Sequence, residues 1–266
     1  MCPVLYLCGT AVSSYSFCAV LAGMVFVLLT AFLYRKKYLG PWQIFLPLLM
    51  AAAALIGARA LNVLLNPGAY GLVFSPWKLS YEKMSLVGGL TAGLLPLLLF
   101  AHAKQRAVQV LLDPLVVPAA LSIMILKTGC FLNGCCVGKE TDGPLGMVFP
   151  ANNTDYAILE ELGLLHPGPH TVHPAQLYEI AGTLAALLLS VWLAHHLHLA
   201  PGGRFGLFAA LFSLARLLIL PIRLLPYPPL ILHFAYPALY LAMILTGLWL
   251  CRHWGRQQSG LFGGPS

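Results

Sequence analysis

Seven apolar stretches, each about as long as a membrane span, constrain this chain more than any other feature. They cover roughly residues 14–34, 44–65, 84–103, 107–127, 176–198, 204–225 and 229–250. A helix needs about 20 apolar residues to cross the hydrocarbon core of a bilayer. Of the 266 residues, 59% are hydrophobic and only 9% are charged, which excludes an ordinary soluble enzyme. We therefore predict an all-α polytopic membrane bundle of about seven transmembrane helices, with residues 1–266 forming a single integral membrane domain.

The charges between these stretches predict the orientation. One set of alternate loops and ends carries only basic residues, namely Arg35, Lys36, Lys37, Lys104, Arg106, Arg204, Arg252 and Arg256. The other set carries three lysines, Lys78, Lys83 and Lys139, together with all the acidic loop residues: Glu82, Glu140, Asp142, Asp155, Glu160 and Glu161. Basic loops stay in the cytoplasm, so we expect the N-terminus outside and the C-terminus inside. The loop at about 138–175 is then an extracytoplasmic cap, and 257–266 is expected to be a flexible tail. No basic run carries interleaved aromatics, so no nucleic-acid partner is expected.

Several ionisable residues fall inside the apolar stretches, where a charge is costly and usually faces a polar cavity. They are Arg59, Asp113, Lys127, Glu179, Arg216 and Arg223. Arg216 and Arg223 are seven residues apart, which places them two turns apart on one helix face. Each charge could simply pair with a carboxylate or reach a headgroup. As a set, however, they predict a cationic cavity, open to the outer leaflet, that binds an anionic lipid headgroup.

Three of the seven cysteines, Cys130, Cys135 and Cys136, lie close together in the sequence. One interpretation is that small thiols fill the junction between a helix and a loop. A second is a redox or covalent role, because nearby cations lower a thiol pKa. A third is a metal site that also uses His166, His170 or His173, but the spacing is not a standard zinc pattern. We expect no cofactor and no metal.

Residues 126–150, LKTGCFLNGCCVGKETDGPLGMVFP, resemble the central motif of the bacterial prolipoprotein diacylglyceryl transferases. The resemblance continues over most of the chain, at Pro3 to Tyr6, Tyr15, Gly57 to Arg59, Met84 to Leu90, His173 to Glu179, Arg216 and Arg223. It is closest to a cysteine-bearing branch of the family. The resemblance implies transfer of diacylglyceryl from phosphatidylglycerol to the lipobox cysteine thiol of a prolipoprotein signal peptide. It also implies a multi-pass protein of the bacterial inner membrane.

The resemblance also suggests roles for individual residues. The catalytic candidates are Lys127, Arg216, Tyr15 and Glu179. The candidates for lipid or phosphate contact are Arg59, Asn133, Gly138, Lys139, Arg223, Gly88 and Gly89. Cys130, Cys135 and Cys136 are candidates for thiol chemistry.

The chain also departs from the family motifs. The family histidine of the H-G-G-L segment is Val87, and the carboxylate of the sixth-span motif is Leu220. In the central motif, lysines replace two family arginines, at Lys127 and Lys139, and Cys130 and Cys135 replace an asparagine and a glutamate. The general base is therefore unassigned: Glu179, His173 or no dedicated group. Two alternatives stay open, a thiol-redox or cysteine-dependent transferase with another acceptor, and a non-catalytic lipid-binding bundle.

Overall fold

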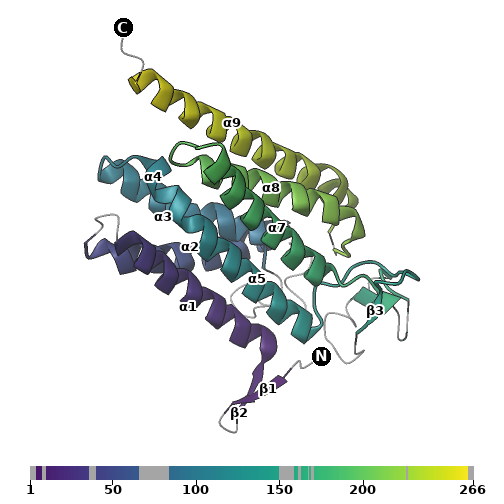
Figure 1. The fold of residues 1–266 in the computed structure, drawn as a ribbon. Coiled ribbons are helices and arrows are strands. Elements are labelled where there is room, and N and C mark those ends of the chain that lie inside the picture. Colours follow the sequence, from purple (N-terminus) through teal and green to yellow (C-terminus); the bar gives the residue numbers. More distant parts are fainter. Residues whose placement is uncertain are drawn as a thin grey trace.

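The computed structural model describes residues 4–7, 10–35, 40–65, 84–149, 159–160, 163–166, 168, 171–225 and 227–262. Its long helices are α1 (Ser14–Arg35), α2 (Trp42–Leu65), α3 (Leu86–Ala103), α5 (Val116–Asn133), α7 (Ala175–His196), α8 (Gly203–Ile219) and α9 (Tyr236–Phe262). Shorter helical pieces join or extend them, namely α4 (Val108–Leu112), η2 (Asp113–Leu115), η3 (Leu220–Ile222) and the π-turn η4 (Ile231–Ala235). The helices form a bundle in which α5 and α7 lie near the centre (Figure 1).

The prediction of seven spans is confirmed. Within the described residues, seven helical segments are long and apolar enough to cross a membrane, and each coincides with a predicted stretch. The fourth differs most, because it runs from Val108 through α4, η2 and α5 to Asn133. It passes Lys127 and ends only at Gly134, whose φ of 77° is the left-handed conformation that commonly terminates helices.

The helices pack as neighbours along the bundle, with α1 against α5, α5 against α7, α7 against α8 and α8 against α9. Helices α2 and α3 make a separate close pair. A Cβ added to Gly88 of α3 would lie 2.3 Å from the carbonyl oxygen of Gly57 in α2. Only glycine allows the two backbones to approach this closely, as is common between membrane helices.

Helix α9 continues to Phe262, so it includes the first residues of the predicted tail at 257–266, whose flexibility stays a prediction. Glutamine and leucine, which occur in this segment, are good helix formers. A helix that is already formed extends through such residues at little cost.

Four short strands accompany the helices in the described residues. β1 (Val4–Leu7) and β2 (Thr10–Ser13) form an antiparallel hairpin before α1, and β3 (Met147–Val148) pairs with β4 (Thr171–Val172) in the predicted cap. The segment after α5 pairs on both sides, through the bridges Gly138–Arg223 and Glu140–Val172. Backbone hydrogen bonds therefore attach the cap directly to the chain that leaves α8 and η3.

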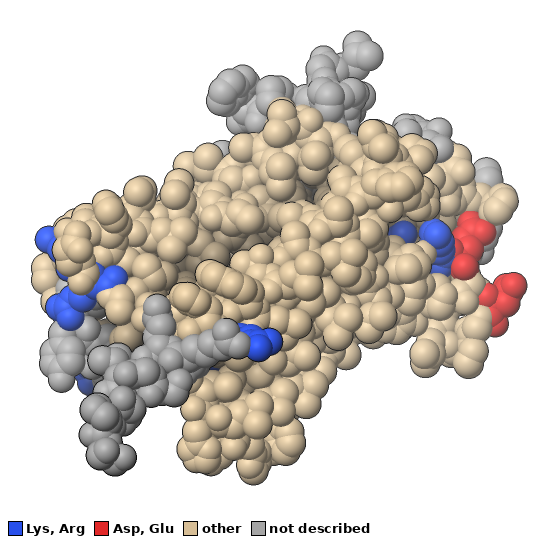
Figure 2. All heavy atoms as spheres, turned by 90° about the horizontal axis from the view of Figure 1, so that it is seen from above, with Lys and Arg blue, Asp and Glu red and all other residues tan. Residues whose placement is uncertain are grey.

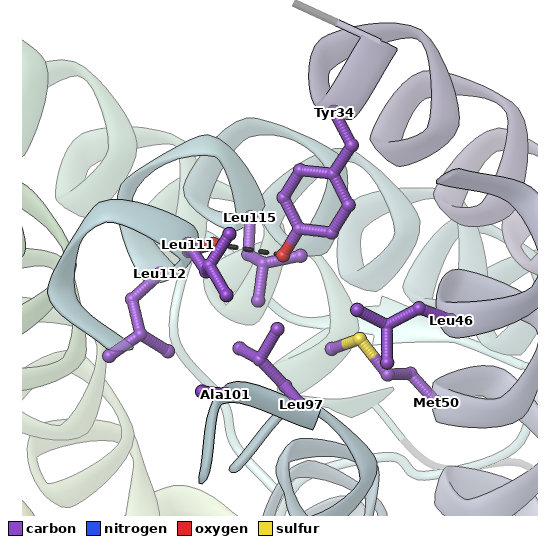
Figure 3. Packing of buried hydrophobic residues seen from close by; sticks show 8 residues of the cluster. All are labelled: Tyr34, Leu46, Met50, Leu97, Ala101, Leu111, Leu112 and Leu115. Carbon is purple, nitrogen blue, oxygen red and sulfur yellow. Dashed lines mark hydrogen bonds between the residues drawn. The ribbon is translucent and has the colours of Figure 1, made fainter. Parts of the chain in front are cut away.

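The two ends of the bundle differ in charge. Figure 2 shows acidic side chains at one end of the molecule and most of the basic ones at the opposite end. At the basic end, an apolar cluster surrounds the fully buried Tyr34, whose hydroxyl donates a hydrogen bond of 2.9 Å to the carbonyl of Leu111 (Figure 3). Asp113 lies at this end as well. Its carboxylate accepts bonds of 2.9 Å from the backbone N–H groups of Gly202 and Phe205, at the start of α8.

Candidate functional site

Three cations meet one carboxylate at the acidic end of the bundle. Lys127 Nζ pairs with Oε2 of Glu179, whereas Arg216 pairs with Oε1. The Nε atom of Arg223 lies 3.1 Å from the same Oε1. All four side chains are at most 10% exposed. We call Lys127, Glu179, Arg216 and Arg223 the charge cluster.

Each member of the charge cluster comes from a different part of the bundle. Lys127 is near the end of α5, Glu179 is in the second turn of α7, and Arg216 is in the last turn of α8. Arg223 lies beyond η3, in extended backbone with φ −73° and ψ 142°. The prediction that Arg216 and Arg223 share one helix face is therefore wrong, because α8 ends before Pro221, which cannot continue the hydrogen-bond ladder.

The charge cluster is unbalanced. One carboxylate faces three cations, so two positive charges remain uncompensated among these four side chains. Burial of unpaired charge is strongly unfavourable unless another group compensates it. The predicted convergence of Lys127, Arg216 and Arg223 is thus observed, and the three share a single acid instead of each having its own. The excess charge makes the cluster suited to an anionic ligand such as phosphate.

A second cluster of side chains lies beside the first. The Sγ atoms of Cys130, Cys135 and Cys136 all lie within 4.8 Å of one another, and no disulfide joins them. We call them the thiol cluster. Cys130 is in the last turn of α5, and the other two follow in the turn after Gly134. Cys130 and Cys135 are buried, whereas Cys136 is partly accessible.

The three thiols are not equivalent. Hydrogen bonds from the Cys130 and Cys135 thiols, with further help from Lys127 and Arg223, hold the pKa of Cys136 well below its usual range. The same thiol–thiol hydrogen bonds and burial raise the pKa of Cys135. Cys136 is therefore the thiol of this cluster that ionises most readily.

Sequence reasoning missed Gln176, which connects the two clusters. Its side chain is fully buried, and Nε2 donates a hydrogen bond of 2.6 Å to the carbonyl of Cys135. Gln176 and Glu179 are three residues apart in α7 and therefore share a face. This spacing was visible in the sequence, and it could have predicted that both side chains point to the same site. Arg216 also reaches α9, where its Nη2 lies 3.5 Å from the hydroxyl of Tyr240.

Four other predicted site residues lie around the end of α5. Tyr15 is partly buried, and its Cα lies 3.4 Å from where a Cβ on Gly129 of α5 would be. Asn133 Oδ1 accepts a bond of 3.3 Å from the Ser13 hydroxyl, so it faces the start of α1. Gly138 donates its N–H to the carbonyl of His173 at 2.8 Å. Lys139 has an exposed side chain and is not among the ion-pair partners of Glu179.

The remaining predicted lipid contacts are in α2 and α3. Arg59 is half-buried in α2 and is not one of the three cations paired with Glu179. Gly88 and Gly89 are buried against α2, where a Cβ on Gly89 would lie 3.4 Å from Ala58. The two glycines thus serve close helix packing, and their contact with lipid stays a prediction.

Two family-motif departures lie in the same place. Val87, at the family histidine position, and Leu220, at the family carboxylate position, belong to one buried apolar cluster with Tyr236 and Tyr240. A buried polar group that loses its partner is costly, whereas replacing both partners by apolar groups can be nearly neutral. Replacing the histidine and the carboxylate together by apolar residues therefore leaves neither polar group buried without a partner.

The histidines named for a metal site do not join the thiol cluster. His166 is exposed and pairs through Nδ1 with Glu140 at 2.8 Å, whereas His173 Nδ1 lies 3.2 Å from the hydroxyl of Tyr178. His170 lies outside the described residues. Within the described part of the chain, the group that could hold a metal ion consists of the three cysteines alone.

Comparison with known proteins agrees with this arrangement. A sequence model of the prolipoprotein diacylglyceryl transferase family matches residues 3–253. The phosphatidylglycerol–prolipoprotein diacylglyceryl transferase of Nitratidesulfovibrio vulgaris strain DP4 is 30% identical over 212 residues, which cover 75% of this chain and 73% of that protein. The protein of the same name from Clostridium tetani is 26% identical over 134 residues, covering 50% of this chain and 49% of that protein. The one from Allorhizobium ampelinum is 31% identical over 140 residues, covering 51% and 43%.

Proposed function

The chain belongs to the prolipoprotein diacylglyceryl transferase family, and we propose that it transfers diacylglyceryl from phosphatidylglycerol to the cysteine thiol of a prolipoprotein. Seven membrane-length helices and this membership make it a multi-pass protein of the bacterial inner membrane. The names of its relatives give both substrates. We further propose roles for individual residues, an orientation in the membrane and a position for the signal peptide.

The charge cluster is the observation that carries this function. In the transfer, the acceptor thiolate attacks a glyceryl carbon, a carbon–sulfur bond forms, and the bond from that carbon to the phosphate oxygen breaks. The electron pair of the broken bond stays on glycerol phosphate. Lys127, Arg216 and Arg223 supply an uncompensated positive charge that can stabilise this leaving group in a site with little water. An interaction that strengthens as charge develops lowers the barrier of the reaction.

Glu179 acts in this proposal as a positioning residue and not as the base. Both of its oxygens are engaged by cations, which makes the carboxylate a poor proton acceptor. Its contribution is to hold three like charges close enough to act on one phosphate. Tyr15 and Asn133, on the adjoining α1 and α5, would contact the headgroup or the departing glycerol.

The orientation follows from the positive-inside rule. Arg35, Lys104, Arg106, Arg204 and Arg252 lie at the ends of α1, α3, α8 and α9 that are remote from the charge cluster. If this end is cytoplasmic, the charge cluster faces the outer leaflet. A prolipoprotein signal peptide that spans the membrane would then present its lipobox cysteine at the same depth.

Complementation tests the proposal. The protein is expressed in a bacterium depleted of its own transferase, and unmodified prolipoprotein is followed by gel mobility. We expect the wild type to restore lipoprotein maturation and Lys127→Ala to fail, because loss of one phosphate-stabilising cation costs on the order of 100-fold in rate. Arg252→Ala, which removes an exposed cation at the opposite end, is the matched control and should complement. Failure of the wild type at normal expression and membrane insertion would contradict the proposed function.

The contact between three thiols favours a second candidate, a cysteine-dependent transferase or redox protein on the same fold. A redox protein would cycle two of these thiols through a disulfide. The complementation assay distinguishes the two candidate functions, because only a transferase converts prolipoprotein to its lipidated form. A redox protein would instead leave prolipoprotein unmodified while its own thiols become oxidised.

A further inference from the structure

The backbone of the thiol cluster is unusual. Cys135 and Cys136 are adjacent, and adjacent side chains in regular backbone point in different directions. Here Cys136 has a φ of 62°, a left-handed conformation that non-glycine residues rarely adopt. Together with the turn at Gly134, this conformation brings both Sγ atoms within 4.8 Å of Cys130. Gln176 holds the turn from α7 through its bond of 2.6 Å to the carbonyl of Cys135.

The spacing of the three sulfurs suits a thiophilic ion. The three sulfurs lie within 4.8 Å of one another, so one point lies no more than about 2.8 Å from each of them. Zinc–sulfur bonds are about 2.3 Å, so a shift of at most roughly half an ångström per side chain completes the site. Three protein ligands leave one position of tetrahedral zinc open, which is typical of catalytic zinc and not of structural zinc. The partial exposure of Cys136 leaves the cluster accessible from one side.

The charges around the thiols are consistent with such an ion. Three thiolates and Zn²⁺ carry one net negative charge, and the neighbouring charge cluster has an excess of two positive charges. Cationic neighbours therefore lower the electrostatic cost of gathering three thiolates. Before the acceptor thiolate binds, one positive charge still remains to favour the phosphate of the lipid.

We propose that Cys130, Cys135 and Cys136 bind one Zn²⁺ whose fourth position takes the acceptor thiol of the prolipoprotein as a thiolate. A thiol that coordinates zinc is deprotonated at neutral pH, and its proton passes to solvent. The bound sulfur then attacks the glyceryl carbon as described above, and glycerol phosphate leaves with the electron pair. No side-chain base is needed, which agrees with the apolar cluster around Val87 and with the occupied oxygens of Glu179. This inference rests on the proposed function, because it names how the acceptor is activated.

Metal binding is tested first without reference to activity. The full-length protein is purified in detergent under reducing conditions, stripped with a chelator, and titrated with Zn²⁺ against a competing indicator; Co²⁺ is used as a spectroscopic probe. We expect one ion per chain and a thiolate-to-cobalt charge-transfer band. Cys130→Ser, Cys135→Ser and Cys136→Ser should each weaken zinc binding at least tenfold. Cys18→Ser and Cys251→Ser, which remove described thiols elsewhere, should bind like wild type.

Acceptor coordination is tested with synthetic lipobox peptides. Addition of the cysteine peptide to the Co²⁺ protein should change the cobalt spectrum through a fourth sulfur, whereas the same peptide with serine should leave it unchanged. Equal changes of the cobalt spectrum with both peptides would overturn the proposal that the acceptor thiol binds at the fourth position of the metal. Thermal denaturation of the metal-free serine variants shows whether each still folds.

The outcomes separate the two proposals. Absence of stoichiometric binding, or wild-type binding by all three serine variants, overturns the zinc site even if complementation succeeds. A protein that binds zinc through these cysteines and yet fails to complement contradicts the proposed function and leaves the metal site intact. Full transfer activity in the chelated protein would also overturn the zinc proposal.

Discussion

The two ends of the bundle bury polar groups in opposite ways. At the basic end, the buried hydroxyl of Tyr34 is satisfied by the carbonyl of Leu111 (Figure 3), and the half-buried carboxylate of Asp113 is satisfied by two backbone N–H groups. At the acidic end, one carboxylate is shared by three cations, and three unpaired thiols lie beside them. The first arrangement stabilises the fold without any ligand.

This difference indicates which end is functional. A buried excess of charge is costly in the free protein, so it persists where a ligand supplies the missing charge. The strained Cys136 is at the same end. Substitutions at the basic end should therefore alter stability alone, whereas those at the acidic end should alter binding and transfer as well.

Glu179→Gln should have the largest effect. Loss of the shared carboxylate leaves three buried cations without an acid, and breaking a buried ion pair costs about 3–5 kcal/mol. We expect a marked fall in the thermal unfolding temperature in detergent, together with loss of complementation. Asp142→Asn, an exposed acid at the same end, is the matched control and should unfold like wild type. Equal stability of Glu179→Gln and wild type would show that the cations do not depend on this carboxylate.

A double-mutant cycle at Val87 and Leu220 should have an intermediate effect. Val87→His alone buries a polar ring among apolar side chains and should destabilise the protein by about 1–3 kcal/mol. Adding Leu220→Glu supplies a partner, so the double variant should be more stable than the sum of the two single changes predicts. Additive losses in chemical denaturation would show that the two positions do not interact.

Tyr34→Phe should have the smallest effect. It removes one neutral hydrogen bond to Leu111 and should cost about 1 kcal/mol. Complementation should remain at the wild-type level, because this residue is at the end remote from the charge cluster. A transfer defect in a normally folded Tyr34→Phe protein would break the proposed division between the two ends.

The sequence predicted the fold better than the site. Span positions follow from apolar length, so all seven were found, and ionisable residues in spans correctly pointed to Lys127, Arg216 and Arg223. The sequence alone could not show that these cations share Glu179, because this sharing depends on how α5, α7 and α8 pack. The closeness of the three cysteines in the sequence indicated the thiol cluster. Its geometry, however, depends on the left-handed φ of Cys136, and a cysteine at that position does not predict such a conformation.

The central claim is that the uncompensated cations of the charge cluster hold the phosphate of an anionic lipid. Native mass spectrometry of the purified protein, exchanged with equimolar phosphatidylglycerol and phosphatidylethanolamine, measures this directly. We predict selective retention of phosphatidylglycerol by the wild type and by Arg252→Ala, and at least a tenfold loss of that selectivity in Arg223→Met. Equal retention of the two lipids by the wild type, or unchanged selectivity in Arg223→Met, would contradict the claim.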